Sequence, residues 1–163
     1  MRKYSCIMKE KFINTKINVY SYNELTDIDK KLIDLAKEAT KRSYSPYSKF
    51  KVGAAILLSN GEIVTGSNQE NVAFPSGTCA ERTAIFYAHS QYPEEKIKKI
   101  AIAAYYEGDF VSKPISPCGA CRQAILEYET LGNSAIEVLL YGKDEIYMLE
   151  GIKTLLPLQF DEF

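Results

Sequence analysis

Apolar residues in the first part of the chain recur with two different periods. Between residues 11 and 22 every second residue is apolar or β-branched, which predicts a half-buried strand; these residues are Ile13, Thr15, Ile17 and Val19. From residue 27 to residue 44 the apolar residues recur at the spacing of one helix face. Thr26 is suited to cap this helix, and Pro46 to end it. A strand followed by a helix is therefore expected before Pro46.

The middle of the chain has the pattern of a hairpin followed by a helix. A continuous apolar run at 52–58 is closed by Ser59-Asn60-Gly61 and answered by residues 62–66, which predicts a β-hairpin. Residues 66–78 are rich in turn formers and predict an ordered loop, and residues 79–90 predict a helix. Cys79 is therefore expected where a loop enters a helix.

The last third repeats this arrangement. A strand is predicted over 97–106, a connection without regular structure over 107–117, and a helix that starts at the Cys118 pair and ends near Gly132. Two further strands over 135–141 and 145–150 and a short helix before Pro157 complete the pattern. Strands alternating with helices in this way predict an α/β fold, a sheet with helices packed on its faces.

Composition narrows the class of protein. The chain has 163 residues, long enough to bury about 68–70% of its unfolded surface, so it needs neither disulfides nor metal merely to fold. Its 20 Lys and Arg are balanced by 21 Asp and Glu, which disfavours a nucleic-acid or membrane-surface binder because both need clustered cations. Neither a signal-peptide pattern nor an apolar stretch of about 20 residues is evident, so we expect a cytoplasmic protein with reduced thiols.

Three of the four cysteines form a pattern that suits a metal. Cys118 and Cys121 make a C-x2-C pair, and both this pair and Cys79 stand at predicted helix starts, where backbone N–H groups stabilise thiolates. Zn²⁺ is the expected occupant. Three ligands with an open fourth position is the catalytic arrangement; a structural site would instead need Cys6 as the fourth ligand. His89 is ten residues beyond Cys79 on the same predicted helix, about 15 Å along its axis, and is out of reach both as a ligand and as the partner of a Cys/His hydrolase.

Charged residues beside the cysteines have two interpretations. Glu81 can take a proton from a zinc-activated water and pass it on, or it can simply be an acid placed favourably in the first turn of a helix. Three thiolates leave a zinc site with a net charge of −1, which weakens activation of water unless cations offset it. Arg82 and Arg122 can supply that offset, or be solvated surface arginines.

At this point the segments Thr78-Cys79-Ala80-Glu81-Arg82 and Pro117-Cys118-Gly119-Ala120-Cys121-Arg122-Gln123 resemble the C-A-E-R and P-C-G-A-C-R-Q signatures of the cytidine deaminase family. The likeness covers roughly residues 27–160 and includes SPYSKFKVGAAILL, SNQENVAF and LLPLQF. It implies a three-layer α-β-α fold with a mixed sheet of about five strands over residues 27–163, preceded by an extension over residues 1–26. Phe74 stands where family members often have Tyr, and the connection after residue 106 is long.

The resemblance also implies roles. Cys79, Cys118 and Cys121 would hold Zn²⁺, and Glu81 would move protons during attack of water at C4 of the cytosine ring. Asn68 and Glu70 would bind the ribose hydroxyls, Phe50 would pack on the base, and the backbone of Ala80 would contact the pyrimidine edge. Arg82, Arg122 and Gln123 would support the metal ligands, and Phe160 would close a neighbouring subunit's site in a homotetramer. Without the resemblance, Phe50 is a core residue, Asn68 and Glu70 are loop residues, and Phe160 docks on its own core.

The expected activity is hydrolytic deamination of cytidine and 2′-deoxycytidine in pyrimidine salvage. Another cytosine nucleoside, such as a nucleoside antibiotic, is a second candidate substrate. Deaminases of tRNA or DNA typically have H-x-E at the first ligand, whereas position 79 is Cys. A structural four-cysteine zinc module, a protein that binds partners and has no catalysis, is the alternative from a different class.

Overall fold

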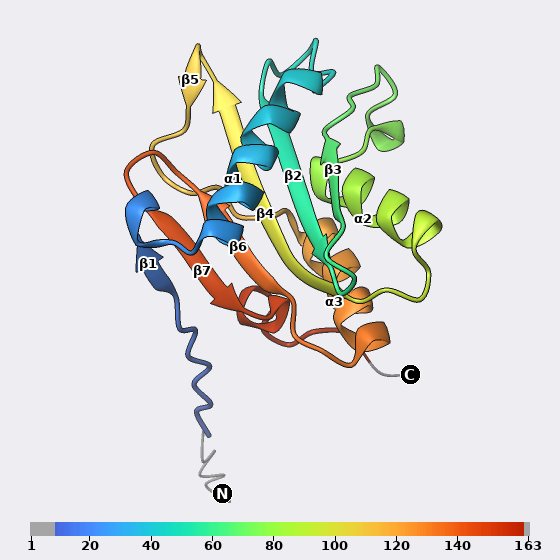
Figure 1. Ribbon diagram of the computed structural model, residues 1–163. Coiled ribbons are helices and arrows are strands. Elements are labelled where there is room, and N and C mark those ends of the chain that lie inside the picture. Colours follow the sequence, from blue (N-terminus) through green and yellow to red (C-terminus); the bar gives the residue numbers. More distant parts are fainter. Residues whose placement is uncertain (1–8, 162–163) are drawn as a thin grey trace, which may run out of the picture.

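Three layers of secondary structure are visible in the computed structural model, which describes residues 9–161 (Figure 1). A twisted sheet forms the middle layer. Helix α1 (Asp27–Ala39) covers one face, and α2 (Ala80–Gln91) and α3 (Gly119–Gly132) cover the other. Short 3-10 helices occupy Tyr22–Glu24, Thr40–Arg42, Phe74–Ser76 and Ile152–Leu155. The α/β class with helices on both faces is therefore confirmed.

The sheet contains more strands than the five or so expected. Its strands are β1 (Asn18–Tyr20), β2 (Lys51–Leu58), β3 (Ile63–Ser67), β4 (Ile97–Tyr106), β5 (Asp109–Phe110), β6 (Glu137–Tyr141) and β7 (Ile146–Glu150). They lie in the order β1-β7-β6-β4-β2-β3, with β5 paired to the end of β4. The β4–β6 pair is parallel and the other pairs are antiparallel, so the sheet is mixed, as expected.

Each face of the sheet has its own apolar core, because successive residues of a strand point to opposite faces. Ala54 and Ile56 of β2 pack toward α2 and α3, whereas Ala55 between them packs toward α1. All three are fully buried. A strand buried on both faces has a continuous apolar sequence, which explains the run at 52–58.

Two glycines allow the helices to approach the sheet closely. A Cβ on Gly53 of β2 would stand 2.1 Å from the carbonyl oxygen of Ala36 in α1, and a Cβ on Gly66 of β3 would stand 2.5 Å from the amide nitrogen of Ala84 in α2. Real Cβ atoms are not found this close to backbone. Gly66 therefore allows α2, the helix that begins directly after Cys79, to pack closely on β3.

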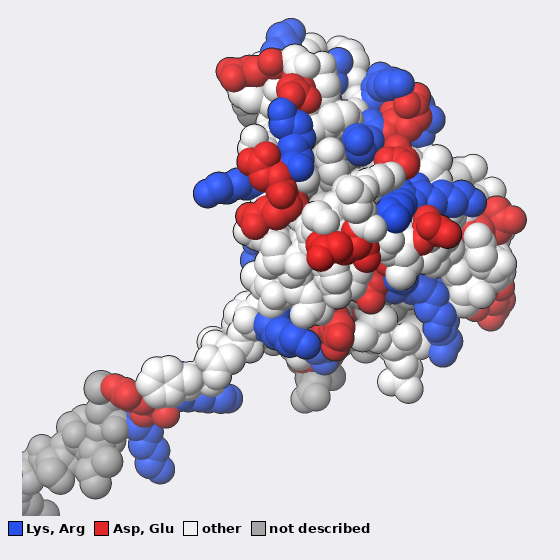
Figure 2. Space-filling view, turned by 60° about the vertical axis from the view of Figure 1, so that its left-hand side comes forward, with Lys and Arg blue, Asp and Glu red and all other residues white. Residues whose placement is uncertain are grey.

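The strand predicted over residues 11–22 is much shorter in the structure. Only Asn18–Tyr20 pairs, antiparallel with β7, and β1 is the edge strand at that side of the sheet. Residues 9–17 lack regular structure and run away from the sheet (Figures 1 and 2), with one hydrogen bond to the body from the Thr15 hydroxyl to the carbonyl of Thr154, across 2.9 Å. Part of the reason is that β7 ends at Glu150: with Asn18 opposite Met148, no β7 residue lies opposite residues 11–15.

The helix predicted to reach residue 44 ends five residues earlier. Thr26 caps it as expected, accepting a hydrogen bond from the amide of Asp29. At the other end the backbone of Tyr44 is used elsewhere: its N–H donates to the carbonyl of Asn68 across 3.0 Å, and its carbonyl accepts from the N–H of Glu70 across 2.8 Å. These bonds to the loop after β3 require extended backbone at residue 44.

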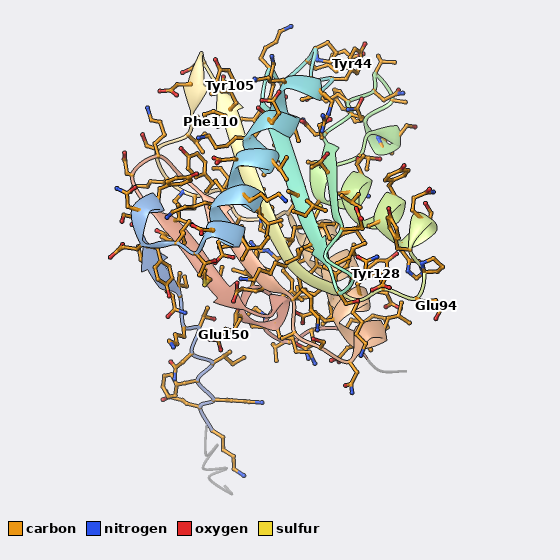
Figure 3. The ribbon with its side chains drawn as sticks, viewed as in Figure 1. Tyr44, Glu94, Tyr105, Phe110, Tyr128 and Glu150 are labelled. Carbon is orange, nitrogen blue, oxygen red and sulfur yellow. The ribbon has the colours of Figure 1, made fainter. Side chains whose placement is uncertain are left out.

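The segment 107–117 was predicted to be a connection without regular structure, but it contains a short strand. Glu107 and Gly108 have φ of 52° and 89°, which makes a tight turn of the kind that joins two antiparallel strands. β5 follows and pairs with the end of β4, where the rings of Tyr105 and Phe110 meet edge to face at 5.2 Å (Figure 3). The other predicted elements are confirmed: the hairpin of β2 and β3, α2, α3, β4, β6, β7 and the short helix before Pro157.

Candidate functional site

Cys79 is held at the start of α2 by the loop that follows β3. Gln69 and Thr78 exchange two backbone hydrogen bonds, with N···O distances of 2.8 and 2.9 Å, so the loop closes on itself directly before Cys79. Cys79 is the N-cap residue of α2, and its carbonyl accepts from the amide of Thr83 across 3.0 Å. Its thiol therefore lies at the positive end of the helix dipole, where a thiolate is stabilised.

The C-x2-C pair stands at the start of α3. Cys118 is the N-cap residue and Cys121 lies in the first turn, so both sulfurs share the end of one helix. The sulfurs of Cys79, Cys118 and Cys121 all lie within 4.8 Å of one another, and those of Cys79 and Cys118 are 3.8 Å apart. Two helix starts far apart in the sequence thus bring the three predicted ligands together.

The spacing of the sulfurs fits zinc. Thiolates about 2.3 Å from a tetrahedrally coordinated zinc ion stand about 3.8 Å apart, which is the Cys79–Cys118 separation. Cys121 is buried, Cys79 is partly buried and Cys118 is exposed, so one side of the cluster opens to solvent. These residues could hold zinc with a fourth position open to water.

The electrostatics at Cys79 favour a thiolate. The Cys121 thiol is its main hydrogen-bond donor, and Nη2 of Arg82 lies 3.9 Å from its sulfur. These partners lower the pKa of Cys79 to about 5, against the effect of burial. Arg82 therefore supplies part of the positive charge that a three-thiolate site needs.

Glu81 is buried beside the cysteines. Its exposed fraction is 4%, and the Cys121 thiol is a hydrogen-bond partner of its carboxyl. Burial raises the pKa of Glu81, and the negative charge of Cys79 raises it further. An acid in the first turn of a helix placed only for its favourable charge would be exposed. Burial beside Cys79 and Cys121 instead suits a group that takes up and releases a proton during a reaction.

Arg122 lies apart from the thiols. Its Nε donates to the carbonyl of Pro117 across 2.8 Å, Nη1 donates to the carbonyl of Leu155 across 2.6 Å, and Nη2 donates to the hydroxyl of Ser116 across 2.9 Å. Of the two arginines considered from the sequence, the structure therefore brings only Arg82 to a thiol. Gln123 donates to the carbonyl of Phe160 across 2.8 Å, which fixes the C-terminal segment to α3.

A cavity of about 650 Å³ opens beside Cys79 and Arg82. Asn68, Glu70 and Phe74 also line it, so the predicted sugar-binding pair and the first metal ligand share one hollow. A cavity of this size accommodates a small-molecule ligand. The structure thus brings together most of the residues predicted to form the site.

Asn68 and Glu70 are both anchored by their neighbours. The Asn68 side chain accepts from the amide of Val52 across 2.8 Å and from the hydroxyl of Ser43 across 2.5 Å, and donates to the carbonyl of Phe50 across 2.9 Å. The Glu70 carboxylate accepts from the hydroxyl and amide of Ser48 and from the amide of Tyr47. The Ser48 hydroxyl is the main cause of a lowered pKa of Glu70, so this carboxylate is ionised near neutral pH.

Phe50, Ala80 and Phe160, also predicted from the sequence to contact the substrate, are not among the residues that line this cavity. Ala80 is fully buried. Phe50 is partly buried, with its ring 5.7 Å from that of Tyr106. Phe160 is 67% exposed. His89 stands in the last turn of α2 against Tyr128 of α3, with ring centres 5.2 Å apart (Figure 3). Cys6 lies outside the described residues.

The anchoring residues were not identified from the sequence. Tyr47 and Ser48 lie in the segment quoted for its family likeness and Ser43 lies just before it, and the serine-rich turn around Pro46 was the available signal. Pairing of these residues with Asn68 and Glu70 depends on tertiary contact. The acceptors of Arg122 are two backbone carbonyls and one serine, which leave no recognisable sequence pattern.

The comparisons with known proteins agree with this geometry. Residues 26–133, more than half of the chain, match the family model described as the cytidine and deoxycytidylate deaminase zinc-binding region. A cytidine deaminase from Sporosarcina psychrophila is 49% identical over 98 residues, 60% of this chain and 68% of that one. A probable cytidine deaminase from Dictyostelium discoideum is 36% identical over 132 residues, covering 81% and 83%.

A solved structure extends the likeness to three dimensions. The crystal structure of cytidine deaminase from Burkholderia pseudomallei superposes with a TM-score of 0.69 at 36% identity, covering 83% of this chain and all of that one. The matched region contains α2, α3 and all three cysteines. The chain belongs to the cytidine and deoxycytidylate deaminase family.

Proposed function

We propose that this protein catalyses the hydrolytic deamination of cytidine and 2′-deoxycytidine, releasing ammonia and forming uridine and 2′-deoxyuridine. One observation carries the proposal: three thiols within 4.8 Å of one another stand beside a buried carboxyl, and one of them, Cys79, lines a cavity of about 650 Å³. A purely structural zinc site requires neither a buried carboxyl beside the ligands nor an adjacent cavity.

Cys79, Cys118 and Cys121 would hold the zinc ion, and the chemistry that zinc supplies when bound is activation of a water as nucleophile at neutral pH. Arg82 offsets the excess negative charge of three thiolates. The N-termini of α2 and α3 add to this effect, since both cap residues are metal ligands.

Glu81 moves the protons. In the net reaction the oxygen of water bonds to C4 of the cytosine ring and the bond from C4 to the exocyclic nitrogen breaks. Glu81 takes a proton from the water, delivers it to N3, and then delivers the second water proton to the departing nitrogen, which leaves as ammonia. Its burial supports this role, because burial raises the pKa of Glu81 above its ordinary value and so favours the protonated form that can deliver a proton.

The sugar and the base are assigned to the cavity wall. Asn68 keeps one amide hydrogen beyond its bond to Phe50, and the ionised Glu70 has lone pairs beyond those used by Ser48 and Tyr47, so the pair can donate to and accept from ribose hydroxyls. Phe50 packs on the base and the Ala80 backbone contacts the pyrimidine edge. The assignment of Asn68 and Glu70 rests on the family likeness together with the cavity that both line, and the assignment of Phe50 and Ala80 rests on the family likeness.

A homotetramer in which Phe160 closes a neighbouring subunit's site is part of the proposal. Its support is that Phe160 is 67% exposed on a segment whose backbone is fixed by Gln123. Residues 27–163 would form the catalytic domain and residues 1–26 an extension. A cytoplasmic location in pyrimidine salvage suits thiols that must stay reduced.

A single nucleoside is favoured over a polynucleotide. Lys and Arg alternate with Asp and Glu over the face in Figure 2, and the net charge of the chain is −1, so no continuous cationic track is visible there for a phosphate backbone. Among residues 9–161, no helix has the length and apolar character needed to span a membrane.

The test is a deaminase assay on the purified full chain, with zinc content measured on the same sample. We expect one zinc per chain and conversion of cytidine and 2′-deoxycytidine to the uracil nucleosides, lost with a chelator and restored by zinc. A cytosine nucleoside antibiotic and a cytosine-containing oligonucleotide are run in parallel, and preference for either would overturn the substrate assignment. Zinc lost in Cys6→Ser, with no turnover in the parent, would instead favour the structural module.

A further inference from the structure

The segment 9–17, called the arm, leaves apolar side chains exposed. Phe12 is 79% exposed, Ile13 51% and Ile17 42%, and Val19 in the adjoining β1 is 56% exposed. The Thr15 hydroxyl donates to the carbonyl of Thr154 across 2.9 Å and ties the middle of the arm to its own chain, and in Figure 2 the arm then projects from the body. Apolar side chains gathered on a projecting segment are a common mark of a contact surface in soluble proteins.

The backbone of β1 also has an edge that pairs with no other strand in the described structure. β1 is the last strand in the sheet order, with β7 on one side, so its outer edge faces solvent in the described structure. An open edge with apolar neighbours is a template for pairing with another strand. The arm continues directly into β1, and its alternation of apolar and polar residues is that of a strand.

The arm is also suited to pair with itself. In an antiparallel ribbon with a two-fold axis at Thr15, Ile13 faces Ile17 of the partner subunit, and Thr15 faces Thr15 of the partner subunit. Lys16 then faces Asn14 of the partner subunit, so no like charges are opposed. β-branched residues facing each other across strands stabilise a ribbon, whereas like charges destabilise it. A two-fold ribbon uses the same surface twice, as in most symmetric dimers.

We propose that the arm and β1 pair antiparallel with the same segment of a second copy of this chain, forming a two-stranded ribbon centred on Thr15. In this register the partner's arm continues along the open edge of β1, because Lys11 of the partner subunit lies opposite Val19. The arm precedes the family-matched region 26–133 in the sequence. The inference does not depend on the proposed catalytic activity.

Disulfide trapping tests the register directly. In a Cys6→Ser background, Thr15→Cys places two thiols opposite each other, with Cα atoms about 4.5–5.5 Å apart, within the range of a disulfide. The matched control is Lys9→Cys in the same background: it lies on the same exposed arm, but its copies would stand about 40 Å apart at about 3.4 Å per residue. We expect a covalent dimer from mild oxidation of Thr15→Cys and little from Lys9→Cys. Equal cross-linking of the two, or none from Thr15→Cys, would overturn the proposal.

A second measurement separates pairing from a chance collision of thiols. Amide hydrogen exchange over residues 11–19 is expected to be slow in the parent, and faster by roughly tenfold or more in Ile13→Asp/Ile17→Asp, where each Asp faces another. Ile13→Val/Ile17→Val keeps the β-branched pairs and should keep the protection. Exchange in α2 and α3 reports that all three proteins are folded. Fast exchange of the arm in the parent at high protein concentration would refute the ribbon.

Discussion

Nη1 of Arg122 donates to the carbonyl oxygen of Leu155 across 2.6 Å, which joins the first turn of α3 to the 3-10 helix near the C-terminus. The same guanidinium binds Ser116 and Pro117, the two residues before Cys118. Arg122 therefore holds the backbone that leads into one metal ligand while standing next to another. This arrangement assigns it a positioning role at the metal centre.

The Arg122→Gln variant is expected to lose zinc faster. A glutamine side chain cannot reach all three acceptors of Arg122. The carbonyl of Pro117, a buried residue, then loses its hydrogen-bond donor, and we expect the loop before Cys118 to become less rigid. Loss of groups that orient metal ligands typically costs about 10–100-fold in metal affinity. Zinc release to a chromogenic chelator measures the effect. Lys153→Gln, which removes an exposed ion pair from the same 3-10 helix, is the matched control. Release at the parent rate in Arg122→Gln would show that this clamp does not position the ligands.

Glu81→Gln should keep both the fold and the metal but lose turnover. Glutamine has the shape of the carboxyl and carries no charge to be desolvated, so stability is expected to equal or exceed that of the parent. A missing proton shuttle lowers kcat by about 10²–10⁴-fold. The assay is run beside zinc analysis and thermal denaturation, with the exposed Glu127→Gln on α3 as control. Parent-like turnover in Glu81→Gln would remove Glu81 from the mechanism.

Asn68→Ala is expected to impair both binding and stability. The side chain joins β2 to the loop before it through Ser43, Phe50 and Val52, so its removal leaves partly buried groups unpaired, at a cost of about 1–3 kcal/mol in the free energy of unfolding. If Asn68 also contacts ribose, KM for cytidine rises in parallel. Asn60→Ala, in the exposed turn between β2 and β3, is the comparison. A lower melting temperature with unchanged KM would mean that Asn68 only supports the loop.

Local pattern was sufficient to predict the elements with strong internal signals. The helices at Cys79 and Cys118 begin with recognisable start residues, and the apolar run of β2 is bounded by a turn with Gly61 at φ 88°. The metal ligands followed from these starts, because two predicted helix ends carried all three cysteines. Spacing along the chain was therefore enough to suggest a site that the structure assembles.

The features that were not predicted from the sequence depend on tertiary contacts. The strand pattern of residues 11–17 is present, but a strand needs a neighbour to pair with, and in the β1–β7 register no β7 residue lies opposite residues 11–15. The helix toward residue 44 stops because Tyr44 bonds to the loop after β3. The partners of Arg122 were equally invisible in the sequence, since two of the three are carbonyl groups that any residue carries.

The close packing of α2 on β3 depends on Gly66. In Gly66→Ala the new Cβ would stand 2.5 Å from the amide nitrogen of Ala84 and 2.7 Å from the carbonyl oxygen of Ala80, so the start of α2 must move off the sheet. Because Cys79 caps this helix, the shift separates its sulfur from the other two and weakens the metal site together with the fold.

We expect Gly66→Ala to lose about 1–3 kcal/mol of stability through overpacking and to bind less than one zinc per chain. Gly132→Ala is the matched control: its Cβ would meet only the Lys96 side chain, at 3.7 Å, and alanine is the better helix former at that position. Thermal denaturation and zinc stoichiometry are measured on both variants. If Gly66→Ala is destabilised but binds as much zinc as the parent, the geometry of the metal site does not depend on the close packing of α2, because the sulfurs keep their spacing without it.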